Sequence, residues 1–125
     1  MTWDVKYFAE YWDGKKLAYP NVPKESPKFA RSMVVGNLVF VSGCTGQDTI
    51  TGKPTAEKFE DQMTMALTKV KMAMEEAGSS MENVVKTVVY LTDMGDFARM
   101  NEVYGHYLGL KPPARTTVQV AALPR

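Results

Sequence analysis

Cysteine and histidine are scarce in this chain of 125 residues, which contains one of each. A lone Cys44 rules out a disulfide framework within one chain, and a free thiol is typical of a reducing compartment, so we expect a cytoplasmic location. One cysteine and one histidine also cannot supply a Cys/His zinc site within one chain. We therefore expect no metal.

The chain also lacks an excess of charge and any long apolar run. The chain has fifteen Lys and Arg residues and 14 Asp and Glu residues, which gives a net charge of +1. Because there is no basic excess, we expect no nucleic-acid partner. No stretch approaches the ~20 apolar residues of a membrane span, and the N-terminus is too polar for a secretory signal. The length fits one domain, with no membrane partner.

Residues 1–16 differ from the rest and are predicted to form an aromatic N-terminal extension, followed by one domain over 17–125. Five aromatic residues between Trp3 and Trp12 have helical spacing, and Gly14 fits the position after a helix, which favours a short helix. Asp13-Gly14 also fits a hairpin turn. This aromatic surface covers either its own core or a neighbouring subunit.

Hydrophobic periodicity predicts the remaining elements. In chain order they are two strands within 33–42, a helix over 56–77, a strand over 84–92, a helix over 95–108 and a strand over 115–121. Thr55 and Gly78 are the expected caps of the first helix, and the apolar run Leu38 to Val41 predicts a strand covered on both faces. The order indicates an α+β fold in which a single sheet carries both helices on one face.

The sequence contains two stretches that resemble catalytic or binding motifs, a phosphate loop and a Cys/His nucleophilic pair, and neither fits its pattern. The loop from Gly46 to Pro54 has five residues between its glycines, and Pro54 stands where a phosphate loop needs Ser or Thr to hold magnesium. A nucleophilic pair of Cys44 and His106 lacks an orienting partner, so His106 is interpreted as a helix-surface residue.

Arg115 remains as a candidate for chemistry. It begins a strand directly after the rigid Pro112-Pro113-Ala114 segment, and hydroxyl-bearing residues follow it. An arginine in this place is either a solvated charge or a fixed planar fork that matches a carboxylate.

From about Leu17 to Pro124 the chain resembles the RidA/YjgF family of reactive-intermediate (imine/enamine) deaminases. The resemblance is carried by Val35–Gly43, Asn83–Phe97, Asn101–Tyr104 and Pro113–Pro124, of which the segment Pro-Ala-Arg-Thr-Thr-Val-Gln-Val is the most specific. It implies a chorismate-mutase-like α+β fold and a homotrimer in which three sheets form a central barrel, with sites between subunits. It also implies hydrolysis of 2-imino or 2-enamino acids to 2-keto acids and ammonia, without metal or organic cofactor.

The same resemblance assigns residues. Arg115 is the catalytic arginine that binds the substrate carboxylate, and the substrate-binding residues are Gly43, Ser42, Phe29, Asn101 and Thr117. Family members often have Tyr in place of Phe29 and Cys in place of Thr117. Cys44 is a candidate reactive thiol at the cleft, with a buried inert thiol as the alternative.

The sequence ends at Arg125, where family members continue into a strand with a water-orienting glutamate. Either the given sequence stops short of the natural end, or this protein has lost the water-orienting group. With this C-terminal strand absent, we expect the 125-residue chain to bind keto acids but to hydrolyse imines slowly. Two rival functions stay open. One is a non-catalytic carboxylate-binding module or metabolite sensor, and the other is an RNA-directed role, which the net charge disfavours.

Overall fold

The computed structural model describes residues 9–11, 29–47 and 58–124. The strands are β1 (Ala9–Tyr11), β2 (Ser32–Val35), β3 (Leu38–Val41), β4 (Lys86–Leu91) and β5 (Ala114–Gln119); the helices are α2 (Phe59–Glu76) and α3 (Phe97–Leu108), and two 3-10 turns span Met81–Asn83 and Met94–Asp96. Within these ranges, no helix combines the length and apolarity needed to cross a bilayer. The predicted order β-β-α-β-α-β is confirmed from β2 onward.

The strands form two sheets in the described residues, where the sequence predicted one. β1, β2 and β3 form the first sheet, and β4 pairs with β5 in the second. The β2–β3 pair is antiparallel about a turn at Gly36, whose φ of +59° suits glycine, whereas β4 and β5 are parallel and joined through α3. No hydrogen-bonded ladder between described residues joins β3 to β4, so the two sheets are distinct.

The N-terminal prediction of a helix was wrong where the structure can test it. Ala9–Tyr11 is a strand, which pairs in parallel with β2 from Ala9 opposite Ser32 to Tyr11 opposite Val34. An open strand edge supplies hydrogen-bond partners that outweigh local helical periodicity. The predicted boundary of the aromatic extension at residue 16 lies outside the described residues.

The first long helix has a well-defined C-terminus. Gly78 has a φ of +86°, and its N–H donates to the Glu75 carbonyl at 3.0 Å while Ser79 N–H donates to the Met74 carbonyl at 2.8 Å. These two bonds close the helix as the sequence predicted for Gly78. At the other end α2 begins at Phe59, preceded by Lys58 rather than Thr55, which lies outside the described residues.

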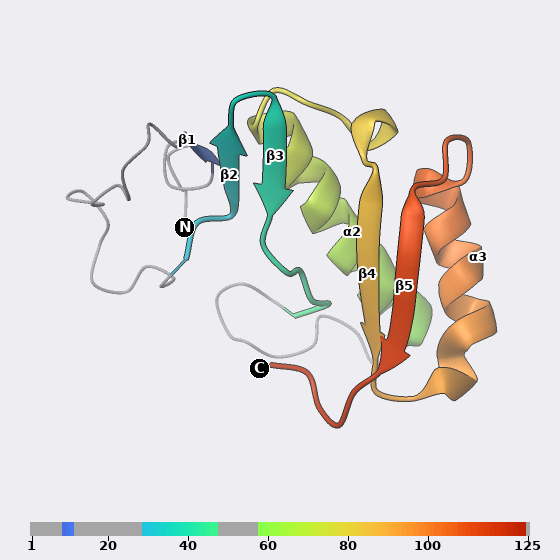
Figure 1. Ribbon diagram of the computed structural model, residues 1–125. Coiled ribbons are helices and arrows are strands. Elements are labelled where there is room, and N and C mark those ends of the chain that lie inside the picture. The colour runs from blue at the N-terminus through green and yellow to red at the C-terminus, as the bar shows by residue number, and fades with distance from the viewer. Residues whose placement is uncertain (1–8, 12–28, 48–57, 125) are drawn as a thin grey trace.

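Both helices cover the same side of the strands (Figure 1). The core is a cluster of six buried residues, contributed mainly by α3 and completed by α2 and β4: Leu67, Leu91, Met100, Val103, Tyr104 and Leu108. The predicted helical layer on one face is therefore present.

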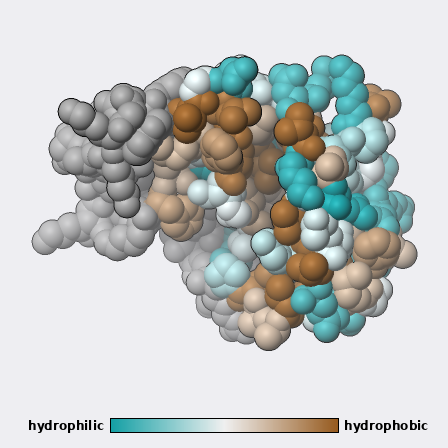
Figure 2. Space-filling view, viewed as in Figure 1, coloured by the Kyte–Doolittle hydropathy of each residue, from teal (hydrophilic) through white to brown (hydrophobic). Residues whose placement is uncertain are grey.

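The opposite face of the strands is open and apolar in this chain. Phe40 of β3 is 60% exposed and Tyr90 of β4 is 54% exposed, and hydrophobic side chains are visible over both sheets in Figure 2. The prediction that Leu38 to Val41 is covered on both faces was wrong for the single chain, because the helices cover only one side. A second layer would have to come from elsewhere.

Candidate functional site

Arg115 lies near the start of β5, and its half-buried side chain faces α3. Its Cζ atom is 4.8 Å from the centroid of the Tyr104 ring and 5.6 Å from that of Phe97. Nη1 also lies 3.7 Å from the sulfur of Met100, which is fully buried. Two aromatic rings and a thioether therefore surround the guanidinium, and cation–π attraction stabilises it there.

No carboxylate neutralises Arg115 among the described residues. The ion pairs of the described chain use other cations, such as Arg31 with Glu76 at 3.0 Å and Arg99 with Glu60 at 3.5 Å. A guanidinium has five N–H donors, and aromatic faces do not accept all of them. A half-buried arginine of this kind retains donors for an anion that comes from outside the described residues.

Thr117 and Asn101 lie on the two elements that hold this arginine, β5 and α3. Thr117 is on the same face of β5, two residues further on, and its hydroxyl oxygen is buried with no hydrogen-bond partner in the described residues. Asn101 is half-buried on α3, between Phe97 and Tyr104 on one helical stripe. A buried hydroxyl without a partner is costly, so a ligand or water is its natural complement.

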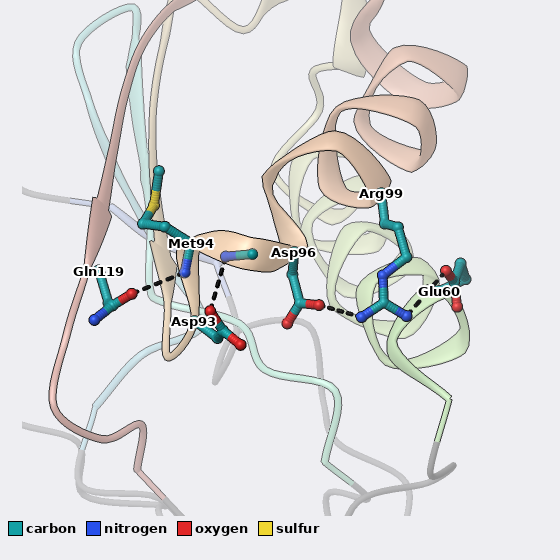
Figure 3. A network of polar contacts seen from close by, with 7 residues as sticks. Glu60, Asp93, Met94, Asp96, Arg99 and Gln119 are labelled. Carbon is teal, nitrogen blue, oxygen red and sulfur yellow. Dashed lines mark hydrogen bonds and ion pairs between the residues drawn. The ribbon is translucent and has the colours of Figure 1, made fainter.

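A polar network fixes the start of α3 relative to β5 and α2 (Figure 3). The Met94 N–H donates to the Gln119 side chain at 2.8 Å, at the end of β5. Arg99 of α3 pairs with both Asp96 and Glu60, the latter on α2. These contacts hold the helix face that carries Phe97 and Tyr104 in register with β5.

The second group of predicted residues follows β3. The Ser42 hydroxyl donates a hydrogen bond to the Ala30 carbonyl at 2.6 Å. Its proton is therefore used in a contact within the chain. Gly43 is exposed, and an added Cβ would meet nothing within 4 Å. Phe29 is 65% exposed.

A single chain does not join the two groups. No hydrogen bond or ion pair in the described residues connects Phe29, Ser42 or Gly43 with Arg115, and in Figure 1 β4 lies between the end of β3 and the start of β5. Arg115 and Thr117 thus lie on β5 and Asn101 on α3, whereas Ser42 and Gly43 directly follow β3 of the other sheet.

Cys44 is half-buried, and its thiol lies 3.5 Å from the Ser42 carbonyl. Burial raises the pKa of this thiol above its ordinary value of 9.0, and the nearby Lys69 and Arg31 oppose that shift only in part. A thiol with a raised pKa is a poor nucleophile at neutral pH. The inert alternative for Cys44 is therefore favoured over the reactive one.

A shallow hollow of about 640 Å³ lies between α2 and α3, and none of the predicted site residues lines it. Its lining includes His106, which is exposed on the surface of α3 as the sequence indicated. Across residues 9–11, 29–47 and 58–124, no group of three or more His, Cys, Asp or Glu residues is arranged to hold a metal ion.

The hydrophobic pattern indicated no role in the site for the residues around Arg115. Phe97, Met100 and Tyr104 lie within the helix predicted over 95–108, and periodicity alone indicated nothing further about them. Their spacing puts them on one face of α3, and the helix leads directly into the strand that begins with Ala114 and Arg115. That juxtaposition was the available signal.

Comparison with known proteins identifies the fold family. The family model described as Endoribonuclease L-PSP matches residues 20–125. The crystal structure of RidA from the Antarctic bacterium Psychrobacter sp. PAMC 21119 is 38% identical, with a TM-score of 0.73, and the match covers 89% of each chain. The chain belongs to the RidA/YjgF family.

RidA/YjgF relatives carry more than one kind of name. A RutC family protein of Pyrococcus abyssi is 41% identical over 82% of this chain and 81% of its own length. A bovine relative, 32% identical over 89% of this chain and 81% of its own length, is named 2-iminobutanoate/2-iminopropanoate deaminase. Some members of the RidA/YjgF family are thus named as imine deaminases, and the family model itself is named for a ribonuclease.

Proposed function

We propose that this protein is a cofactor-independent deaminase that hydrolyses small 2-imino or 2-enamino acids to 2-keto acids and ammonia. The observation that carries the proposal is the half-buried Arg115, held by aromatic rings and without a carboxylate partner in the described residues. Such a guanidinium is suited to bind a substrate carboxylate through two parallel hydrogen bonds. The deaminase names of two mammalian relatives, 32% and 33% identical, support the reaction class.

The chemistry needs little beyond positioning. Water attacks the imine carbon, a C–O bond forms, and the electron pair of the C=N bond moves to nitrogen, which takes up the proton that the water loses. The resulting carbinolamine passes its hydroxyl proton to nitrogen and loses ammonia as its C–N bond breaks and the keto group forms. Because an imine is already electrophilic, fixing its carboxylate on Arg115 next to a held water supplies much of the rate. The Thr117 hydroxyl, which has no hydrogen-bond partner in the described residues, is a candidate to bind that water or the substrate.

The working unit in this proposal is a homotrimer. The open face of the sheets exposes large apolar side chains, among them Phe40, Tyr90 and Val88, the last at 46%. A contiguous surface of this kind is typical of a subunit interface. Contact between copies would also bring Ser42 and Gly43, which follow β3, close to Arg115 of a neighbouring subunit. In a single chain these residues lie apart from Arg115.

A binding module without turnover is the alternative. It is favoured by the absence of any carboxylate or imidazole contact with Arg115 in the described part of the chain, since such a group would normally orient the attacking water. In that case the protein captures keto acids through Arg115 but leaves imines to spontaneous hydrolysis.

A trapping assay separates the two functions. An amino acid oxidase generates 2-iminopropanoate from alanine, and semicarbazide traps the imine as a semicarbazone. A deaminase lowers the rate of semicarbazone formation in proportion to its concentration, and Arg115→Ala abolishes that effect. Unchanged trapping in the presence of a protein that still binds pyruvate would establish the binding module, and loss of both activities would reject the carboxylate site.

A further inference from the structure

Tyr104 links the side chains around Arg115. Its ring is the closer of the two that face the guanidinium, at 4.8 Å. Its hydroxyl lies 2.7 Å from the hydroxyl of Thr87 on β4, and only 7% of the residue is exposed. The ring is thus held by the core along its length and by a hydrogen bond at its tip.

The partner of that hydrogen bond is itself fixed relative to Arg115. Thr87 lies directly opposite Arg115 in the β4–β5 ladder. The contacts therefore close a circuit, from the Arg115 backbone across the ladder to Thr87, through its hydroxyl to Tyr104, and from the ring back to the guanidinium. A circuit of this kind restricts the rotamers of a long cationic side chain before any ligand arrives.

We propose that Tyr104, tethered by Thr87, is a positioning residue for Arg115. Its ring attracts the cation and sets the direction of the guanidinium without using a carboxylate that would compete with a ligand. In this account Tyr104 acts through Arg115 and does not touch the substrate. The inference deepens the proposed function and rests on it, because it assigns the support of the carboxylate-binding group.

The same helix supplies a matched control. Tyr107 is three residues further along α3, half-buried, and its hydroxyl lies 3.1 Å from that of Thr68 on α2. Tyr104→Met and Tyr107→Met each remove one ring and one such bond while keeping apolar volume. Tyr104→Phe keeps the ring and removes only the tether to Thr87.

Two measurements are made on each variant: the Kd for pyruvate and the NMR order parameter of the Arg115 Nε–H group. Tyr104→Met should weaken pyruvate binding roughly 2- to 12-fold, which is the cost of ordering one more flexible side chain on binding. It should also lower the Arg115 order parameter, with Tyr104→Phe intermediate. Tyr107→Met should match the parent in both. Equal behaviour of the two Met variants would overturn the proposal.

The order parameter keeps this test separate from the proposed function. If the parent binds no keto acid, the proposed function fails, and the Arg115 order parameter still decides whether Tyr104 positions it. If Tyr104→Met shows no cooperative thermal unfolding, Tyr104→Phe is compared with Tyr107→Phe. A lower Arg115 order parameter in the first alone supports the tether, and equal values refute it.

Discussion

Replacing Arg115 should abolish keto-acid binding through the loss of a directional donor rather than of a charge. The side chain is held by Tyr104 and Phe97 and has no carboxylate partner in the described residues. Its N–H groups can therefore donate hydrogen bonds to a ligand. Two charge-assisted hydrogen bonds, each contributing about 1.5–3 kcal/mol, correspond to a roughly 10²- to 10⁴-fold loss of affinity in Arg115→Ala. Partial exposure of the site favours the lower part of that range.

Two further variants separate geometry from charge. Arg115→Lys keeps the charge but cannot present a planar fork, so it should recover little of the lost affinity. Lys86→Ala removes a neighbouring positive charge from the exposed face of β4, where Lys86 donates to the Thr116 hydroxyl at 2.8 Å. It should leave affinity nearly unchanged.

Isothermal titration with pyruvate at constant ionic strength measures all three variants, and thermal unfolding confirms that each is folded. Parent-like affinity in Arg115→Lys would refute the role of the fork. A loss in Lys86→Ala as large as that in Arg115→Ala would show that only the summed charge matters.

Further predictions concern stability and the thiol. Gly46→Ala should lower the free energy of unfolding by about 1–3 kcal/mol, because a Cβ there would lie 2.7 Å from the Gln62 carbonyl oxygen; Gly105→Ala on α3, with nothing within 4 Å, should raise it by about 0.5–1 kcal/mol. Urea unfolding measures the free energy of unfolding of both variants, and changes of the same sign in the two would contradict this prediction. Because burial raises its pKa, Cys44 should be alkylated with a midpoint above pH 9.0, and its contribution to stability should decline as the pH rises past that value. A midpoint below pH 8 would exclude the burial argument.

Local signals predicted most of the secondary structure. The two strands within 33–42, the end of α2 at Gly78 and the helix over 95–108 depend on residues close in sequence, and these predictions were confirmed. The strand at Ala9–Tyr11 was missed because its backbone is satisfied by β2, more than twenty residues away. The division into two sheets likewise depends on which strand edges meet, and local periodicity carries no information on that.

The site was predictable only in part. Arg115 stood out through its rigid Pro-Pro-Ala approach and its family motif, and the structure gives it a defined environment. The contacts of Tyr104 with Arg115 and Thr87 could not be predicted, because they depend on the ladder register and on the packing of α3 against it. Ser42 and Gly43 were assigned to the same site by resemblance, and in the single chain they follow β3 of the other sheet.

The most direct measurement is the dependence of imine hydrolysis on the substrate carboxylate. Ammonia release is followed for 2-iminopropanoate, generated in place by an amino acid oxidase, and for a matched imine without a carboxylate, with parent protein and Arg115→Ala. The parent should accelerate only the carboxylate-bearing imine, with a preference in kcat/KM of about 10²-fold or more that disappears in Arg115→Ala. Ammonia release no faster than in buffer, or a preference that survives in Arg115→Ala, would contradict carboxylate-directed deamination at Arg115.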